Sequence, residues 1–258
     1  MKNYIENKTA LITGASSGIG ERLANDLATM GLNLILIARD IDKLTELKAK
    51  LSHIGNTNVE IYKMDVCNRE EVEKIISDIT RKHTVDILIN NAGLALGIEK
   101  IDEGDLDNWD LMIDTNVKGL LYVSRYIIPQ MKNLDTAHII NIGSVAGKTA
   151  YPGGNVYCAT KAAIHSISEA MNADLYGTNV KVTAIAPGAV KTNFSNIRFN
   201  GDDKKANGVY AGYEPLLAED ISSVIINVLN TPKHVNIQYL DIMPTAQRNP
   251  YLLHRDNK

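Results

Sequence analysis

The sequence has few of the features that mark secreted, membrane or nucleic-acid-binding proteins. Its two cysteines, Cys67 and Cys158, are too few for a disulfide framework, which favours a reducing compartment. The longest unbroken apolar run, residues 34–38, is far shorter than the roughly 20 residues of a membrane helix. The first ten residues are polar and lack the apolar core of a signal peptide. A net charge of −3 gives no electrostatic reason to expect nucleic acid or an anionic membrane as a partner. These absences predict a cytoplasmic protein without such partners.

Metal-ligand patterns are also missing. The six histidines show no ligand spacing with one another or with the two cysteines, so no metal site is expected. Phenylalanine is nearly absent, and the only two, Phe194 and Phe199, lie within residues 188–211. That segment is rich in Asn, Gly, Asp and Lys, and a loop of this length inside a domain is typical of a functional lid.

The rest of the composition is that of one ordinary globular domain. The chain has 258 residues, of which 45% are hydrophobic and 22% charged, and no linker or repeat divides it. Short apolar runs alternate with helical patterns at residues 21–30, 42–51, 69–82 and 156–175. We therefore expect a single α/β domain over residues 1–258, with a doubly wound seven-stranded parallel sheet flanked by helices. The expected strands are residues 9–13, 32–38, 59–64, 85–90, 137–142, 180–186 and 237–242.

A glycine-rich turn follows the first expected strand. Its spacing, G-x-x-x-G-x-G, lets the backbone turn tightly at the N-terminus of a helix, where free N–H groups and a partial positive charge favour a pyrophosphate. An ordinary βα turn is the alternative, but the strand before and the helix after favour a dinucleotide. The predicted phosphate-binding residues are Gly14, Ser16, Ser17, Gly18, Ile19 and Gly20.

The end of the second strand predicts which dinucleotide binds. An NAD site places an acidic side chain there, whereas an NADP site needs a cation for the 2′-phosphate. Ala38 stands where the acid is expected, and Arg39 follows with a guanidinium that can hold a phosphate through two hydrogen bonds. In the rival interpretation Asp40 reaches the ribose and Arg39 is only solvated. The residue types favour NADP(H).

Two further strand ends carry candidate cofactor contacts. Asp65 and Val66 follow the third strand and are placed to contact the adenine, although Asp65 is equally suited to cap the helix near Asn68. The small residues after the fourth strand would let the chain pass close beneath a ribose, and they include Asn91, Ala92 and Gly93.

A catalytic group is predicted from Ser144, Tyr157 and Lys161. Tyr157 and Lys161 are four residues apart in a helical segment and share a face, and Ser144 follows the fifth strand at the same end of the sheet. An ammonium about 4 Å away would lower the tyrosine pKa by roughly three units, to around 7. Tyr157 would then give a proton to a carbonyl oxygen while the nicotinamide delivers hydride. Ser144 would bind the same oxygen, Lys161 would also hold the nicotinamide ribose, and Asn116 would hold a water that relays protons.

Taken together, these motifs resemble the short-chain dehydrogenase/reductase superfamily. The resemblance implies a Rossmann fold and adds Pro187, Gly188, Val190 and Thr192 as cofactor contacts, with Thr192 on the nicotinamide carboxamide. It also implies a homotetramer, or a homodimer, joined through helices at residues 106–131 and 156–175. Residues 90–97, 153–161, 194–202 and 235–247 more closely resemble the NADP-dependent 3-hydroxy acid dehydrogenases, also called serine or L-allo-threonine dehydrogenases.

This finer resemblance implies an oxidoreductase that uses NADP(H) on a small 3-hydroxy acid, of the serine, allo-threonine or 3-hydroxypropionate type. Arg198, between Ile197 and Phe199 in the lid, is a candidate for the substrate carboxylate, beside Ser144 and Tyr157 as substrate contacts. A broad carbonyl reductase is the alternative within the superfamily. A non-catalytic NADP(H) sensor is a remote alternative, because the complete Ser, Tyr and Lys set is present.

Overall fold

The computed structural model describes residues 3–54 and 57–256. One sheet runs through this part of the chain, and all of its strands are parallel, in the order β3-β2-β1-β4-β5-β6-β7. The α/β fold class with a doubly wound, seven-stranded parallel sheet is therefore confirmed. The strands are β1 (Thr9–Thr13), β2 (Asn33–Ala38), β3 (Val59–Lys63), β4 (Ile87–Asn90), β5 (Ala137–Ile142), β6 (Val180–Pro187) and β7 (Tyr239–Ile242).

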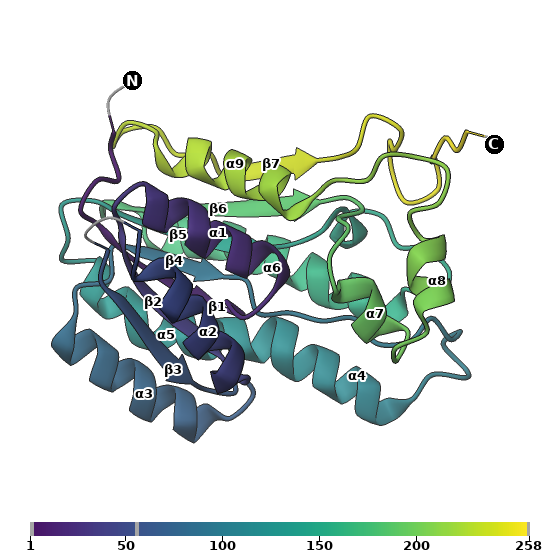
Figure 1. Cartoon of the computed structure of the whole chain (residues 1–258), viewed down its shortest axis with the longest axis horizontal. Coiled ribbons are helices and arrows are strands. Elements are labelled where there is room, and N and C mark those ends of the chain that lie inside the picture. The colour runs from purple at the N-terminus through teal and green to yellow at the C-terminus, as the bar shows by residue number, and fades with distance from the viewer. Residues whose placement is uncertain (1–2, 55–56, 257–258) are drawn as a thin grey trace.

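Helices cover both faces of the sheet (Figure 1). One core joins the sheet to α1 (Gly18–Thr29), α2 (Ile41–Leu51) and α9 (Ala218–Leu229). The other joins it to α3 (Arg69–Lys82), α5 (Leu120–Met131) and α6 (Asn155–Asp174). Successive residues of one strand enter opposite cores, as Ile12 and Leu11 do, because side chains alternate across a strand. This explains why the strands are apolar on both faces.

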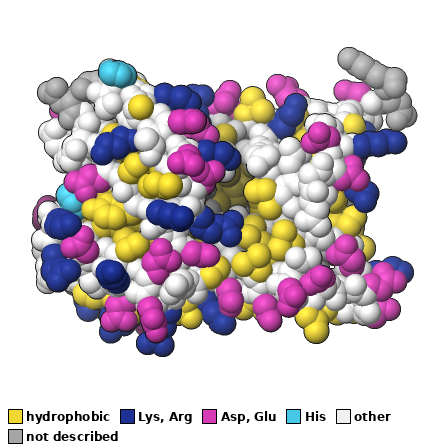
Figure 2. All heavy atoms as spheres, turned by 60° about the horizontal axis from the view of Figure 1, so that its bottom comes forward, with side chains coloured by type: hydrophobic (Ala, Val, Ile, Leu, Met, Phe, Trp, Pro, Cys, Tyr) yellow, Lys and Arg dark blue, Asp and Glu magenta, His cyan; other side chains and the backbone are white. Residues whose placement is uncertain are grey.

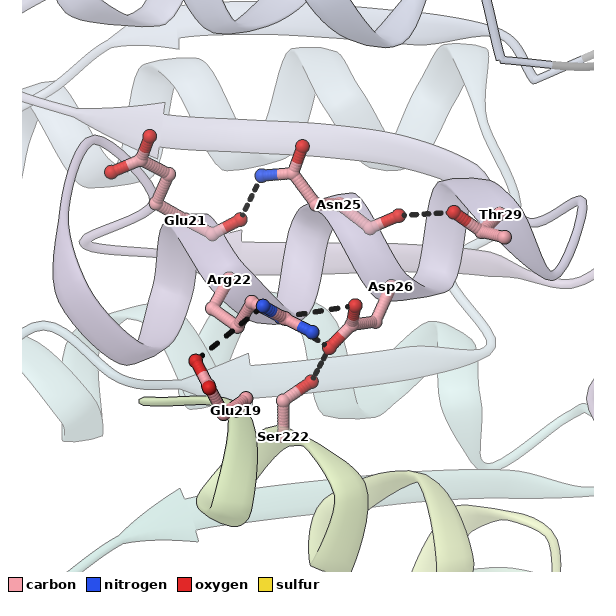
Figure 3. A network of polar contacts seen from close by, with 7 residues as sticks. All are labelled: Glu21, Arg22, Asn25, Asp26, Thr29, Glu219 and Ser222. Atoms are coloured by element: carbon pink, nitrogen blue, oxygen red, sulfur yellow. Dashed lines mark hydrogen bonds and ion pairs between the residues drawn. The ribbon is translucent and has the colours of Figure 1, made fainter. Parts of the chain in front are cut away.

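A partly buried polar contact joins α9 to α1 (Figure 3). Ser222 has no exposed surface and donates a hydrogen bond of 2.6 Å to Asp26, which also pairs with Arg22 at 2.9 Å. Arg22 reaches back to Glu219 at 3.5 Å. Because α1 begins at the glycine-rich turn, this contact helps to hold the N-terminal end of that helix in place.

The segment expected as one helix over residues 106–131 is interrupted. It consists of α4 (Leu106–Ile113), a π-helical turn η1 (Asp114–Gly119) and α5. A π-turn inserted in an α-helix shifts the hydrogen-bond ladder and is frequent at functional sites. Here it contains the buried Asn116.

The predicted lid is not irregular throughout. It contains two short helices, α7 (Phe194–Arg198) and α8 (Asp203–Gly208). In Figure 1 both lie on the side toward which the arrows of β6 and β7 point. The lid therefore lies at the carboxyl end of the sheet, where a short 3₁₀ turn, η2 (Val145–Gly147), follows β5.

Candidate active site

A cleft of about 390 Å³ lies at the carboxyl end of the sheet. Figure 2 shows the molecule hollowed near the centre of this view, with hydrophobic side chains inside the hollow and Lys and Arg side chains at its rim. The cleft is lined by segments that follow β1 through β6, as expected for an open α/β sheet. Most predicted site residues line it: Gly14, Ser16, Ser17, Gly18, Ile19, Arg39, Asp65, Val66, Asn91, Ala92, Gly93, Ser144, Tyr157, Lys161, Pro187, Gly188, Val190 and Thr192. Gly20, Asn116 and Arg198 lie outside that lining.

The glycine-rich turn is tight and closely packed. Gly14 has a φ of +65°, and a Cβ on Gly20 would lie 2.5 Å from the Gly14 carbonyl oxygen, so neither position accepts a larger residue. Ser17 precedes α1 but makes no side-chain capping bond with the described residues. The first N–H groups of α1 are therefore available to an anion in the cleft.

The charged residues after β2 separate into two roles. Asp40 accepts a hydrogen bond of 3.1 Å from the backbone N–H of Lys43 and caps α2, which disfavours the interpretation that Asp40 reads the ribose. Arg39 is exposed and lines the cleft. Lys43 lines it as well, in the first turn of α2, and sequence reasoning missed this second cation. The signal that could have found it was its position in the first turn of the helix that Asp40 caps.

Hydrogen bonds fix the segments of the cleft that follow β3 and β4. Asp65 accepts from the N–H of Cys67 at 3.0 Å, while Asn68 caps α3, so the alternative role of Asp65 as the helix cap is wrong. Asn91 donates to the carbonyls of Thr13 and Gly14 at 2.9 and 3.0 Å. Its side chain therefore braces the glycine-rich turn.

Ser144, Tyr157 and Lys161 meet in the same cleft. Lys161 is 5% exposed, donates to the carbonyl of Ile142 at 2.9 Å and places its Nζ 5.8 Å from the centre of the Tyr157 ring. The Ser144 Oγ lies 3.4 Å from the Pro187 carbonyl oxygen and accepts from the N–H of Ala146 at 3.1 Å. The two residues of α6 thus face the end of β5 that carries the serine.

The pKa of Tyr157 differs from the value expected from its spacing to Lys161. Burial raises this pKa above its ordinary range, and the neighbouring Tyr151 adds to the rise. A hydrogen bond with Ser144 and the charge of Arg198 act in the opposite direction. Burial also lowers the pKa of Lys161 to about 8. Desolvation is therefore the main influence on both groups, and Tyr157 remains protonated at neutral pH.

The side-chain amide of Asn116 bonds to Leu94 and to Thr160, the residue that precedes Lys161. The Oδ1 accepts from the N–H of Leu94 at 2.8 Å, and the Nδ2 donates to the Leu94 carbonyl at 2.8 Å and to Thr160 at 3.0 Å. The amide therefore holds the loop after β4 against α6. That Asn116 holds a water which relays protons stays a prediction.

The lid closes over the site through residues near its start. The Thr192 side chain lies close to Gly18, where an added Cβ would be 3.5 Å away. Phe194 places its ring centre 5.8 Å from that of Tyr157. The lid is braced by Tyr210, which donates to the Val190 carbonyl at 2.9 Å. The segment predicted to contact the nicotinamide thus joins the glycine-rich turn to Tyr157.

Arg198 is brought next to Tyr157, although they are 41 positions apart in the sequence. Its guanidinium carbon lies 5.7 Å from the Tyr157 ring centre and 5.5 Å from that of Tyr151. Tyr151 was not singled out from the sequence, because a tyrosine in a loop carries no pattern. Among the described residues, no group of His, Cys, Asp or Glu side chains is arranged to hold a metal ion.

Comparison with known proteins gives a consistent family. The family model for the short chain dehydrogenases matches residues 8–202. The NADP-dependent 3-hydroxy acid dehydrogenase YdfG of Escherichia coli K12 is 44% identical over 92% of this chain and 95% of its own. Sulfoacetaldehyde reductase 2 of Chromohalobacter salexigens is 40% identical over 92% and 94%. A closed serine dehydrogenase complexed with NADP⁺ superposes with a TM-score of 0.90 at 43% identity, covering 96% of this chain and all of that one.

The chain therefore belongs to the short chain dehydrogenase family, and it is an oxidoreductase that acts on CH–OH donors. The predicted resemblance to the 3-hydroxy acid dehydrogenases is confirmed. The expected cofactor, NADP(H), agrees with the names of these relatives.

Proposed function

We propose that this protein interconverts small 3-hydroxy acids and 3-oxo acids or aldehydes with NADP(H). The observation that carries the proposal is the meeting of Ser144, Tyr157 and Lys161 in one cleft that also offers an uncapped helix N-terminus and two cations. The relatives named for NADP and for 3-hydroxy acids support the same conclusion.

The cofactor is NADP(H), and the residues of the cleft fit it. The glycine-rich turn and the first N–H groups of α1 would hold the pyrophosphate, and Arg39 with Lys43 would hold the 2′-phosphate. Lys161 would hold the nicotinamide ribose, and Thr192 the carboxamide. When bound, the reduced nicotinamide supplies the hydride. The chain's own residues supply the proton and the orientation.

Tyr157 is the proton donor to the substrate oxygen in the direction of reduction, and it accepts that proton in the direction of oxidation. Its raised pKa keeps it protonated at neutral pH, which suits reduction. Ser144 donates a hydrogen bond to the same oxygen and stabilises its developing charge. Lys161 stabilises the phenolate left behind, and a water at Asn116 would return the proton from solvent.

Replacing Arg39 by Ala tests the cofactor assignment. The variant should bind NADPH more weakly by about 2–3 kcal/mol, the scale of a lost charge-assisted contact, while NADH binding stays nearly unchanged. Quenching of protein fluorescence by each cofactor measures both affinities. Arg81→Ala, which removes an exposed cation on α3, is the matched control. Equal weakening toward both cofactors would show that Arg39 does not bind the 2′-phosphate.

The substrate carries an acid group in this proposal, and Arg198 binds it. The guanidinium carbon lies 5.7 Å from the centre of the Tyr157 ring. The guanidinium forms no ion pair with an acidic side chain of the described residues. A carboxylate two bonds from the reacting carbon would be within its reach. A sulfonate, as in the substrate named for the Chromohalobacter salexigens relative, offers the same oxygens and is a second candidate.

Arg198→Ala tests this assignment. We expect KM for 3-hydroxypropionate and L-allo-threonine to rise at least tenfold, because a charge-assisted contact is lost, with a smaller change in kcat. NADPH formation at 340 nm measures both. Lys204→Ala, an exposed lid cation, should leave KM unchanged. An unaltered KM in Arg198→Ala would remove the residue from the substrate site.

The same assay decides between this proposal and the alternatives. A broad carbonyl reductase would turn over alcohols without an acid group as efficiently as hydroxy acids. A non-catalytic sensor would bind NADPH and turn over neither.

The expected homotetramer or homodimer remains a proposal. Leu106, Leu111 and Ile113 of α4 and Leu121 of α5 are exposed apolar side chains on the helices expected to join subunits, and they support it. Among the described helices, none combines the length and apolar character that crossing a bilayer requires. Cytoplasmic localisation stays a prediction.

A further inference from the structure

We propose that a small cavity at the amino end of the sheet binds an oxyanion that carries a hydrogen of its own, namely hydrogen phosphate or hydrogen carbonate. The cavity has a volume of about 50 Å³ and lies at the opposite end of the sheet from the active-site cleft. Its volume exceeds the ~10–15 Å³ that one water requires. It is far smaller than the 390 Å³ of the cleft, so the space suits a small ion.

The cavity is formed where neighbouring strands begin. The strands β1, β4, β5 and β6 are adjacent in the sheet, and each contributes a residue at or just before its first positions. The segment after α9 completes the wall. The charged or ionisable residues from the strand starts are Lys8, Asp86, His138 and Lys181. No residue that lines the active-site cleft takes part, so this site is independent of the proposed function.

The lining has an excess of positive charge. Three ammonium groups, from Lys8, Lys181 and Lys233, face one carboxylate, that of Asp86. Lys8 pairs with Asp86 at 3.0 Å, and Lys233 pairs with Asp135, whose side chain is 87% exposed. Lys181 is 6% exposed and pairs with no carboxylate of the described residues. A buried cation without a counter-ion favours an anion beside it.

The Lys181 ammonium has a donor to spare. Its Nζ donates to the Thr231 hydroxyl at 3.0 Å and to the Thr231 carbonyl at 3.4 Å. Because an ammonium carries three hydrogens, one remains for a ligand. Burial lowers the pKa of Lys181, and the charge of Lys8 lowers it further, so the two ammonium groups are close enough to repel each other. An anion that accepts from Lys181 would offset this repulsion.

His138 supplies a buried acceptor. Thr183 donates its only hydroxyl hydrogen to the Ile237 carbonyl at 2.5 Å, so it accepts from the His138 Nε2 at 2.8 Å. The imidazole hydrogen therefore lies on Nε2, and Nδ1 keeps a lone pair. Burial and the charge of Lys181 lower the pKa of His138 to about 3, which keeps the ring neutral. The Nδ1 is buried and has no hydrogen-bond partner among the described residues.

These groups together determine what the ligand must offer. The ammonium groups need oxygens that accept hydrogen bonds, whereas the Nδ1 of His138 needs a group that donates one. A water would satisfy Nδ1 but would leave Lys181 without a counter-charge. Hydrogen phosphate and hydrogen carbonate offer both functions at neutral pH. Sulfate has the tetrahedral shape of phosphate but no hydrogen, and a buried acceptor left without a donor is costly, so the site should distinguish the two.

Calorimetry on the NADPH-saturated enzyme tests the site, because NADPH fills the proposed phosphate contacts of the active-site cleft. Sodium phosphate and sodium hydrogen carbonate are titrated separately, with sodium sulfate as the comparison. We expect at least one of the first two to bind at one site per chain, about tenfold more tightly than sulfate. The tighter of the two identifies the ligand. Binding of neither, or equal binding of sulfate, would overturn the proposal and show that the cavity holds water only.

Substitutions at the cavity separate its charge from its acceptor. Lys181→Met should weaken binding of the preferred ion about tenfold, because a charge-assisted contact is lost. His138→Gln keeps a donor toward Thr183 but removes Nδ1, so affinities for the preferred ion and for sulfate should then agree within about twofold. Lys233→Met changes only an exposed residue at the rim and should weaken binding about threefold, so the test does not depend on a core substitution.

Two control variants locate the binding. Lys132→Met removes an exposed lysine that follows α5 and lies outside the cavity, and Arg198→Ala removes a cation next to Tyr157 in the active site. Neither should change the affinity for the preferred ion. Wild-type affinity in both Lys181→Met and Lys233→Met would place the ion elsewhere and overturn the proposal. A preference over sulfate that persists in His138→Gln would overturn the role of the donated hydrogen.

Discussion

Replacing Tyr157 by Phe is expected to lower kcat by about 10²–10⁴-fold, the usual contribution of a positioned general acid or base. The substitution removes only the hydroxyl and keeps the ring that packs against Phe194. Cofactor affinity should change little, because the proposed phosphate and adenine contacts lie elsewhere in the cleft. NADPH formation at 340 nm measures kcat, and fluorescence quenching measures the affinity.

Tyr176→Phe serves as the matched control, since Tyr176 is 93% exposed and should carry no function in catalysis. Activity that survives in Tyr157→Phe would exclude the assigned proton donor. A parallel loss of NADPH binding would instead indicate that the ring had moved, and the decrease in kcat would then not measure proton transfer.

The strands were the most predictable part of this fold. Residues 9–13 and 137–142 coincide with β1 and β5, and the other strands differ only at their ends. The reason is physical: a strand covered by helices on both faces is apolar throughout, and that pattern is visible in the sequence. Strand ends depend on which hydrogen bonds the neighbouring strand completes, so they shift by a few residues.

Features that depend on distant contacts were not predictable. The π-turn around Asn116 accompanies bonds from its amide to Leu94 and Thr160, which are 22 and 44 positions away. The lid helix α8 ends where Arg255 donates to the carbonyls of Gly208 and Val209. Local sequence around residues 188–211 contains no sign of this C-terminal contact, so the segment was expected to be irregular.

The candidate site was predictable in its membership and less so in its electrostatics. Spacing alone placed Tyr157 and Lys161 on one helix face, and the position after β5 placed Ser144 beside them. The expected effect of Lys161 on the pKa of Tyr157 assumed a partly solvated pair. The fold instead buries both groups, and burial disfavours the charged form of each. It therefore raises the pKa of Tyr157 and lowers the pKa of Lys161.

The burial of Lys161 predicts a second large effect, on stability. Its pKa falls from 10.5 to about 8 in the folded protein, so the unfolded chain binds the proton more tightly. Below pH 8 both states are protonated and the cost of the buried ammonium is fully present, about 3 kcal/mol. As the pH rises from 8 toward 10.5, the folded amine becomes neutral and this cost disappears.

Lys161→Met should therefore raise the free energy of unfolding at pH 7 while abolishing activity. We expect a gain of about 2 kcal/mol, after allowing about 1 kcal/mol for the lost hydrogen bond to the Ile142 carbonyl. Urea unfolding of the cofactor-free protein at pH 7, 8, 9 and 10 should show the gain shrinking as the pH rises. A lower free energy of unfolding in Lys161→Met at pH 7, or a gain independent of pH, would show that burial of the Lys161 ammonium does not destabilise the fold.

Lys181→Met is the matched control for this trade of stability against function. Lys181 is 6% exposed and its pKa is also lowered by burial, but its Nζ bonds to Thr231 in a small cavity at the amino end of the sheet, away from the cleft. Its removal should affect stability and leave activity in place. If Lys161→Met loses activity and Lys181→Met does not, the result would show that the Lys161 ammonium destabilises the fold but is required beside Tyr157 for activity.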